Sequence, residues 1–256
     1  MLVAAAVCPC PPLLVPEVAT GAAPELDAAR TACADAVGLL AAARPDRLYV
    51  VGPAPGGANG VYPAGTAGSF AGFGVDLSVR LGEGSADEGA GRPADGRSAE
   101  AGEGGPADGR PLPSSLSVAA WLLGRAGWAD APIEGLGVDE AATPDVCAGL
   151  GRGLADSAAR VALLVMGDGS ACRTVKAPGY LDERAAGFDA EAARALGTAD
   201  TAALLALEPE LAYELKVAGR APWQVLAGAA EGAGLDGRLL FEDAPYGVGY
   251  FVAAWS

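Results

Sequence analysis

Two cysteines near the start of the chain are the residues whose spacing first suggests chemistry. Cys8 and Cys10 flank a single proline in the stretch AVCPCPPLLVPE, residues 6–17. In an extended chain, residues two apart face the same side, so the two thiols could converge on one ligand. Thiolates favour soft ions such as Zn(II) or Cu(I) over Fe(II). Alternatively, both side chains are small apolar fillers at a crowded strand end, which is common for free cysteine.

A glycine-rich segment, GDGSACR at residues 167–173, is the second candidate. Its backbone amides, with Arg173 and Lys176 close behind, could cradle an anion. The alternative is a tight turn that uses glycine for its backbone freedom. Asp168 and Ser170 are the candidate catalytic side chains of this segment. Because the 256 residues contain no histidine, Ser170 lacks the usual base, and the commonest transition-metal ligand is absent as well.

Loops that follow apolar runs place further polar groups together. In open α/β sheets, ligands bind beyond the carboxyl ends of the strands, and the loops that begin at residues 8, 52, 168 and 242 leave predicted strands in that sense. The residues expected to contact a ligand there are Pro53, Gly169, Arg173, Lys176, Asp243 and Tyr246.

Hydrophobic patterning predicts the elements that position these loops. Buried strands are expected at 2–7, 47–52, 160–167, 238–243 and 248–255, and an alternating strand near a sheet edge at Phe73–Leu81. Helices are expected at 24–43, from an N-cap at Ser114 through about 127, from an N-cap at Thr143 to about 159, and at 188–196, 201–207, 209–217 and 221–231. This order predicts an α/β fold: a single domain, residues 1–256, with a mainly parallel central sheet flanked by helices.

The segment 82–111 interrupts this pattern. It has almost no apolar side chains and repeats PADGR at Pro93–Arg97 and Pro106–Arg110. Such a composition buries too little surface to offset its ordering entropy, so we expect a disordered insertion; a functional acidic tether is the alternative.

Charge and cysteine usage limit the partners and the compartment. A net charge of -15 makes nucleic acid and anionic membranes unsuitable partners. The apolar runs are shorter than the roughly 20 residues that span a bilayer, and MLVAAAV lacks the basic start of a signal peptide. Five widely spaced cysteines are expected to be reduced thiols. The expected location is the cytoplasm, and the expected partners are a small-molecule ligand and either a second copy or a separate subunit.

Several blocks of the sequence resemble one enzyme superfamily. CPCPPLLVPE at the start, MGDGSACR with APGYLDERAAGFDAEAARAL, ELAYELKVAGRAPWQVL, and LLFEDAPYGVGYFVAAW at the end are similar to the catalytic subunits of class III extradiol ring-cleavage dioxygenases, in an uncharacterised actinobacterial-type branch. The resemblance covers most of the chain outside residues 82–111. It implies the fold of that superfamily and a pocket at the carboxyl edge of the sheet.

The resemblance also implies which residues would act. Active members bind Fe(II) through two histidines and a glutamate and use a further histidine as acid and base. Here the first histidine position is Cys10, the second, near Gly52–Pro55, has no counterpart, and the acid/base position is Ala171. Glu242 stands where the glutamate ligand would. The expected function is therefore a non-cleaving, small-ligand-binding or scaffolding relative. The alternative is a metal-dependent oxidoreductase with Cys10 and Glu242, joined by Cys8 or Asp168, around Zn or Cu(I).

Overall fold

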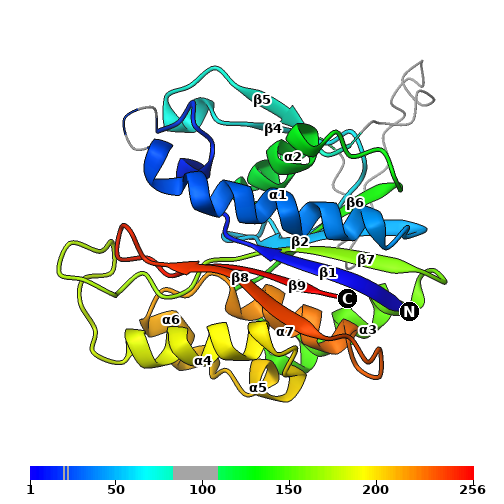
Figure 1. Ribbon diagram of the computed structural model, residues 1–256. Coiled ribbons are helices and arrows are strands. Elements are labelled where there is room, and N and C mark those ends of the chain that lie inside the picture. Colours follow the sequence, from blue (N-terminus) through cyan, green and yellow to red (C-terminus); the bar gives the residue numbers. More distant parts are fainter. Residues whose placement is uncertain (20, 22, 83–108) are drawn as a thin grey trace, which may run out of the picture.

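The computed structural model describes residues 1–19, 21, 23–82 and 109–256. Its described strands form one seven-stranded sheet, in the order β3-β6-β2-β7-β1-β9-β8, and a separate pair, β4-β5 (Figure 1). The strands are β1 (Leu2–Cys8), β2 (Arg47–Pro53), β3 (Gly60–Tyr62), β4 (Ala67–Ser69), β5 (Ser78–Arg80), β6 (Ile133–Val138), β7 (Val161–Met166), β8 (Gly237–Asp243) and β9 (Tyr250–Trp255). The helices are α1 (Asp27–Ala42), α2 (Ser114–Ala126), α3 (Pro144–Asp156), α4 (Ala185–Gly197), α5 (Thr201–Leu205), α6 (Pro209–Glu214) and α7 (Arg220–Ala229).

The centre of the large sheet is parallel and its margins are antiparallel. β2 pairs in parallel with both β6 and β7, and β7 pairs in parallel with β1. At the margins, β3 is antiparallel to β6, β9 is antiparallel to β1, and β8 is antiparallel to β9. The carboxyl ends of β1, β2, β6, β7 and β8 therefore meet at one edge. The expected α/β fold with a mainly parallel sheet is confirmed at this level.

Helices cover both faces of the sheet, and each face has its own core. In Figure 1, α1 and α2 lie above the sheet and α3 to α7 lie below it. Successive side chains of β7 alternate between the two cores. Val161, Leu163 and Val165 belong to the core below the sheet, whereas Ala162, Leu164 and Met166 belong to the core above it. We call the upper surface the α1 face and the lower surface the α7 face.

Local sequence signals account for several of these elements. The opening β1-α1-β2 unit forms as expected, although β7 lies between its two strands in the sheet. Thr143 caps α3 by accepting a hydrogen bond from the backbone of Val146 at 3.4 Å, and Pro144 takes the first helical position. α3 then packs closely on α7, because a Cβ at Gly151 would overlap the carbonyl oxygen of Val225.

Other expectations need correction. Of the predicted strand Phe73–Leu81, only Ser78–Arg80 is a strand, and it pairs with β4 outside the main sheet. Ser114 is the first helical residue of α2, and Pro113 takes the N-cap position that we expected for it. β6 (Ile133–Val138) was not predicted, since its sequence IEGLGV carries two glycines. The predicted insertion lies outside the described residues except for Gly82 and residues 109–111.

The described helices give no sign of a membrane span. None of them is long and apolar enough to cross a bilayer.

Candidate functional site

The parallel strands β1 and β7 bring Cys10 and Asp168 together at the carboxyl edge of the sheet. The register pairs Cys8 with Met166, and the backbone N–H of Gly167 donates to the carbonyl of Cys8 at 3.0 Å. Continuing the register by two residues sets Cys10 opposite Asp168. Both residues belong to the α1 face, because Cys8, Cys10 and Met166 lie in the core of that face.

The Asp168 carboxyl is held by very few groups. The backbone N–H of Cys10 donates to its Oδ1 at 2.8 Å, and the Cys10 thiol points to its Oδ2 at 3.8 Å. The backbone carbonyl of Asp168 accepts from the N–H of Gly219 at 2.8 Å, which fixes the loop at the end of β7. No cation among the described residues forms an ion pair with this carboxyl.

Burial without a cation makes this carboxyl unusually basic. Desolvation raises the pKa of Asp168 to about 7, and the two hydrogen bonds from Cys10 only partly oppose it. Burial and the neighbouring Asp168 raise the pKa of the Cys10 thiol well above its ordinary value. Burial, with Asp168 close by, likewise raises the pKa of the Tyr250 phenol, at the start of β9. The site can exchange a proton at Asp168, whereas Cys10 stays a neutral thiol and a poor nucleophile.

A second carboxyl, Asp189 of α4, lies on the opposite face and is fully partnered. Its Oδ1 accepts from the backbone N–H of Ser170 at 2.8 Å, and its Oδ2 accepts from the Ser170 hydroxyl at 2.8 Å and from Arg173 at 3.0 Å. Asp189 and Ser170 are both fully buried. Of the two pocket candidates in this segment, Asp168 is half-buried and Ser170 is fully buried, and Ser170 and Arg173 donate to the carboxyl of Asp189.

Close packing against the Asp189 carboxyl explains the glycine at position 169 in the segment GDGSACR. Gly169 donates its N–H to the carbonyl of Gly249 at 2.7 Å. A Cβ at Gly169 would lie 2.8 Å from Asp189 Oδ1, and one at Gly249 would lie 2.5 Å from Oδ2. Both positions therefore require glycine for close approach to a carboxylate, which supports the tight-turn interpretation of the segment. Arg173, which was expected to help bind an anion, instead pairs with Asp189.

The other predicted ligand contacts are dispersed. Pro53 is buried, and its carbonyl accepts from the Ser115 hydroxyl at 2.7 Å. Lys176 is exposed, and the Oδ1 of exposed Asp243 accepts from the N–H of Ala244 at 2.7 Å. Burial and a hydrogen bond to Glu25 raise the pKa of Tyr246. Tyr246 also contributes to the raised pKa of Tyr250, one of the groups close to Asp168.

The pairing of Cys10 with Glu242 is corrected by the strand register. Glu242 pairs with Phe251, which belongs to the core of the α7 face, whereas Cys10 lies on the α1 face. Glu242 is also exposed, and β9 separates its strand from β1. Within the described part of the chain, no group of three or more Cys, Asp or Glu side chains could hold a metal ion. The donors present do not fit the Fe(II) centre of the superfamily that the sequence resembles.

Sequence patterning did not point to three residues around these carboxyls. Cys33 of α1 lies against Cys8, and the resulting hydrogen bond, with burial, raises the pKa of Cys33 well above its usual range. Tyr250 and Asp189 were also missed. For Asp189 a signal existed: it is a lone acid on the helix stripe that Phe188, Ala192 and Leu196 bury.

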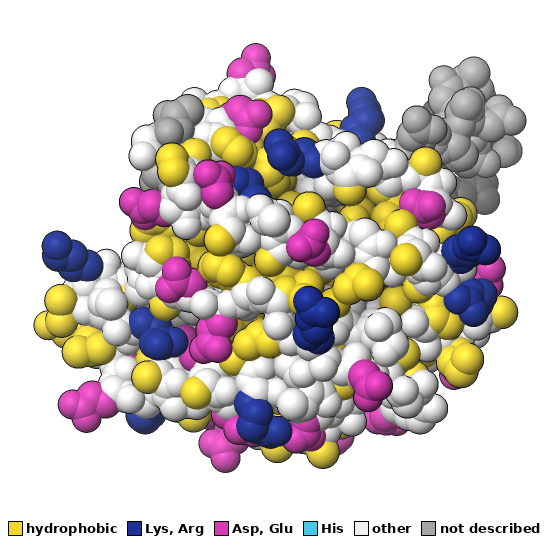
Figure 2. All heavy atoms as spheres, in the orientation of Figure 1, with side chains coloured by type: hydrophobic (Ala, Val, Ile, Leu, Met, Phe, Trp, Pro, Cys, Tyr) yellow, Lys and Arg dark blue, Asp and Glu magenta, His cyan; other side chains and the backbone are white. Residues whose placement is uncertain are grey.

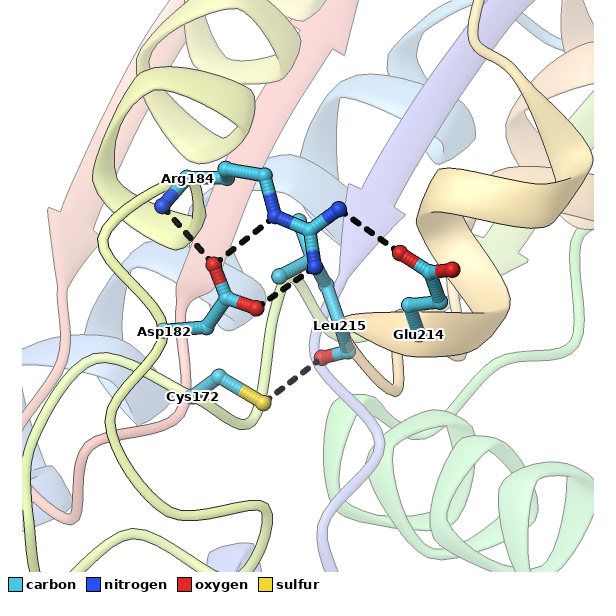
Figure 3. Close-up of polar contacts among 5 residues, drawn as sticks. All are labelled: Cys172, Asp182, Arg184, Glu214 and Leu215. Atoms are coloured by element: carbon cyan, nitrogen blue, oxygen red, sulfur yellow. Dashed lines mark hydrogen bonds and ion pairs between the residues drawn. The ribbon is translucent and has the colours of Figure 1, made fainter.

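Beyond Ser170, one buried and one exposed contact hold the loop that leaves β7 against the end of α6. The Cys172 thiol donates to the carbonyl of Leu215 at 3.4 Å, and Arg184 bridges Asp182 and Glu214, each at 2.7 Å (Figure 3). The hydrogen bonds from Arg184 lower the pKa of Asp182 to about 2. This bridge is exposed and anchors the loop without entering the Asp168 site.

Comparisons with known proteins leave the family open. No family model matches the chain, and no curated protein matches it. Solved structures do match, and one is the crystal structure of uncharacterized protein JW3007 from Escherichia coli K12. The similarity covers 99% of this chain and 99% of that chain, at 15% identity and a TM-score of 0.49. At those values it carries no argument about fold or activity.

Proposed function

We propose that this chain is a class III extradiol dioxygenase-like protein that binds a small phenolic ligand at Asp168 without cleaving its ring. The observation that carries this proposal is the Asp168 carboxyl itself. It lies at the carboxyl edge of the parallel strands, where α/β proteins bind ligands, and it has no cation partner among the described residues. A hydroxyl group of a ligand is a fitting donor to such a carboxylate.

The same residues argue against ring cleavage. Extradiol cleavage in the family uses two histidine ligands and a histidine acid/base, and this chain contains no histidine. Cys10 contacts Asp168, and Glu242 faces the other side of the sheet. The alternative function, a metal-dependent oxidoreductase centred on Cys10 and Glu242, therefore has no support from the donor geometry, and no reaction step is derived through a metal.

Calorimetric titration with catechol, combined with an oxygen electrode, tests the proposal. We expect catechol to bind with or without Fe(II), and oxygen uptake after anaerobic Fe(II) loading to equal that of Fe(II) alone. Binding should weaken roughly tenfold between pH 8 and pH 6, because a carboxyl with a pKa of about 7 loses most of its charge over that range. Asp168→Asn should weaken binding at pH 8 about tenfold or more, since it removes a charged acceptor.

Asp35→Asn is the matched control, because Asp35 is an exposed carboxyl of α1 on the same side of the sheet. It should leave catechol affinity unchanged. A yellow ring-fission product above the Fe(II)-only level would refute the non-cleaving function. Absence of catechol binding at millimolar concentration, or equal effects of the two Asn variants, would refute Asp168 as the ligand-binding group.

A further inference from the structure

The outer edge of the sheet at β8 has no partner strand. Among the described residues, β8 pairs only with β9. Figure 1 shows β8 at the front of the sheet, with α1 above it and α4 below it. An unpaired edge presents free backbone N–H and C=O groups to a further strand.

β8 lacks proline and lysine, two of the features that keep edge strands from pairing. The strand GRLLFED has seven residues, no proline and no lysine, and its central Leu239, Leu240 and Phe241 are only half-buried. Proteins keep an edge strand from associating with prolines, lysines and other charged side chains, bulges or a very short strand. β8 has charged side chains at both ends and a bulge, so only a partner strand that matches both can pair with it. Figure 2 views this edge and shows hydrophobic side chains at the surface along the band between the helices.

A bulge decides which way the side chains of β8 point. Leu239 pairs with Ala253 and Glu242 with Phe251, and both partners belong to the α7 face. Phe241 pairs with Val252 of the α1 face, and the register shifts between Leu239 and Phe241, so that Leu240 joins the same face. By alternation, Arg238 and Asp243 also lie on the α1 face.

This distribution makes the strand complementary to itself. When two identical strands pair antiparallel about a two-fold axis normal to the sheet, opposed residues must lie on the same face. Centring the axis between Leu240 and Phe241 meets this condition along the strand. Arg238 then lies opposite Asp243 of the second copy, Leu239 opposite Glu242, and Leu240 opposite Phe241. Opposite charges across a strand pair are stabilising, and each dimer would contain the Arg238–Asp243 pair twice.

We propose that two copies of this chain associate through β8, and that the two sheets join into one continuous sheet. A second copy fits this edge because the basic end of β8 meets the acidic end of an antiparallel copy. In addition, the bulge places opposed residues of the two strands on the same face of the sheet. The inference is independent of the ligand proposed at Asp168.

Light scattering after size-exclusion chromatography of the full chain tests the association. We expect a dimer mass at high protein concentration that falls toward the monomer on dilution. Arg238→Asp or Asp243→Arg alone should raise the dissociation constant roughly tenfold or more, because each sets like charges opposite each other. The double variant restores opposite charges and should recover most of the affinity. Arg152→Asp, an exposed change on α3, is the control and should leave the mass unchanged.

Engineered cysteines test the register without relying on affinity. Residues 239 and 242 of one strand lie about 10 Å apart, beyond disulfide reach, so a Leu239→Cys, Glu242→Cys variant can cross-link only between copies. We expect a covalent dimer on oxidation, and none from Leu239→Cys alone, because the two copies of residue 239 lie about 10 Å or more apart in this register. A monomer mass at every concentration for the wild-type chain, equal cross-linking by the single and double cysteine variants, or failure of the double charge reversal to recover the dimer would overturn the proposal.

Discussion

Asp168 and Asp189 are two carboxyls at the same end of the sheet, and they differ in the groups that surround them. Asp189 lies on the α7 face and accepts hydrogen bonds from the Ser170 N–H, the Ser170 hydroxyl and the Arg173 guanidinium. Asp168 lies on the α1 face, with one backbone N–H and one thiol. Both are largely removed from water, but among the described residues only Asp189 has a cation to balance its charge.

The difference separates a structural carboxylate from one that can act. A buried charge that is paired and hydrogen-bonded holds its neighbours in one geometry, and here Asp189 fixes the loop after β7 and the start of β9. Burial, with no cation partner among the described residues, raises the pKa of Asp168 to about 7, so this carboxyl can gain or lose a proton near neutral pH. The comparison predicts that Asp189 determines stability, and it supports the proposal that Asp168 binds a ligand.

The largest expected effect is at Asp189. Asp189→Ala leaves the Arg173 guanidinium and two Ser170 donors without their acceptor in a buried cluster, so we expect a loss of about 3 to 5 kcal/mol in the free energy of unfolding. Urea denaturation measures it. Glu191→Ala, on the exposed side of α4, is the control and should leave the transition midpoint in place. A small loss at Asp189, similar to that control, would show that the cluster is not structural.

The second-largest expected effect is a gain in stability, and it comes from changing Asp168. Between about pH 4 and pH 7 the folded protein keeps a proton on Asp168 that the unfolded chain has released, so stability falls as the pH rises through that window. Asp168→Asn keeps an acceptor for the Cys10 N–H and removes the charge. We expect it to stabilise the protein by roughly 2 to 4 kcal/mol at pH 8 and by less at pH 5.5. Urea midpoints at the two pH values measure this, and a variant less stable than wild type at pH 8 would contradict it.

Much of the fold follows from sequence patterning, for physical reasons visible in particular elements. β7 is apolar at every position and is buried on both faces, so a continuous apolar run identifies it. Thr143-Pro144 begins α3 by local chemistry alone. β6 was missed because glycines at 135 and 137 conceal a buried strand. A Cβ at Gly135 would lie 2.8 Å from Leu81, which only the tertiary structure reveals.

The candidate site was less predictable because its partners come from distant segments. Asp168 stands out in the sequence at the end of an apolar strand, but its contact with Cys10 depends on β1 and β7 being neighbours, which requires the strand order. Local sequence could not show that Asp189, 19 residues after Ser170 in the chain, takes the hydrogen bonds of both Ser170 and Arg173. Glu242 was placed near Cys10 by the resemblance alone, and the register of β8 with β9, which contains a bulge, sets it on the other face.

The smallest expected effect on stability is at the exposed ion pairs of Arg184, drawn in Figure 3. They can be compared with the two buried carboxyls, Asp168 and Asp189. Arg184 contacts Asp182 and Glu214 at distances as short as those around Asp189, yet its side chain is 54% exposed. Water and salt screen such pairs, so Arg184→Ala should move the thermal midpoint by less than about 2 °C. The same change should return the pKa of Asp182 from about 2 toward 3.8, because the hydrogen bonds from Arg184 are the largest cause of its depression. Carboxyl NMR titration follows the pKa while calorimetry follows the midpoint. A large fall in the midpoint would show that an exposed ion pair stabilises the fold as much as a buried one. The length of the contact, rather than burial, would then determine its contribution to stability.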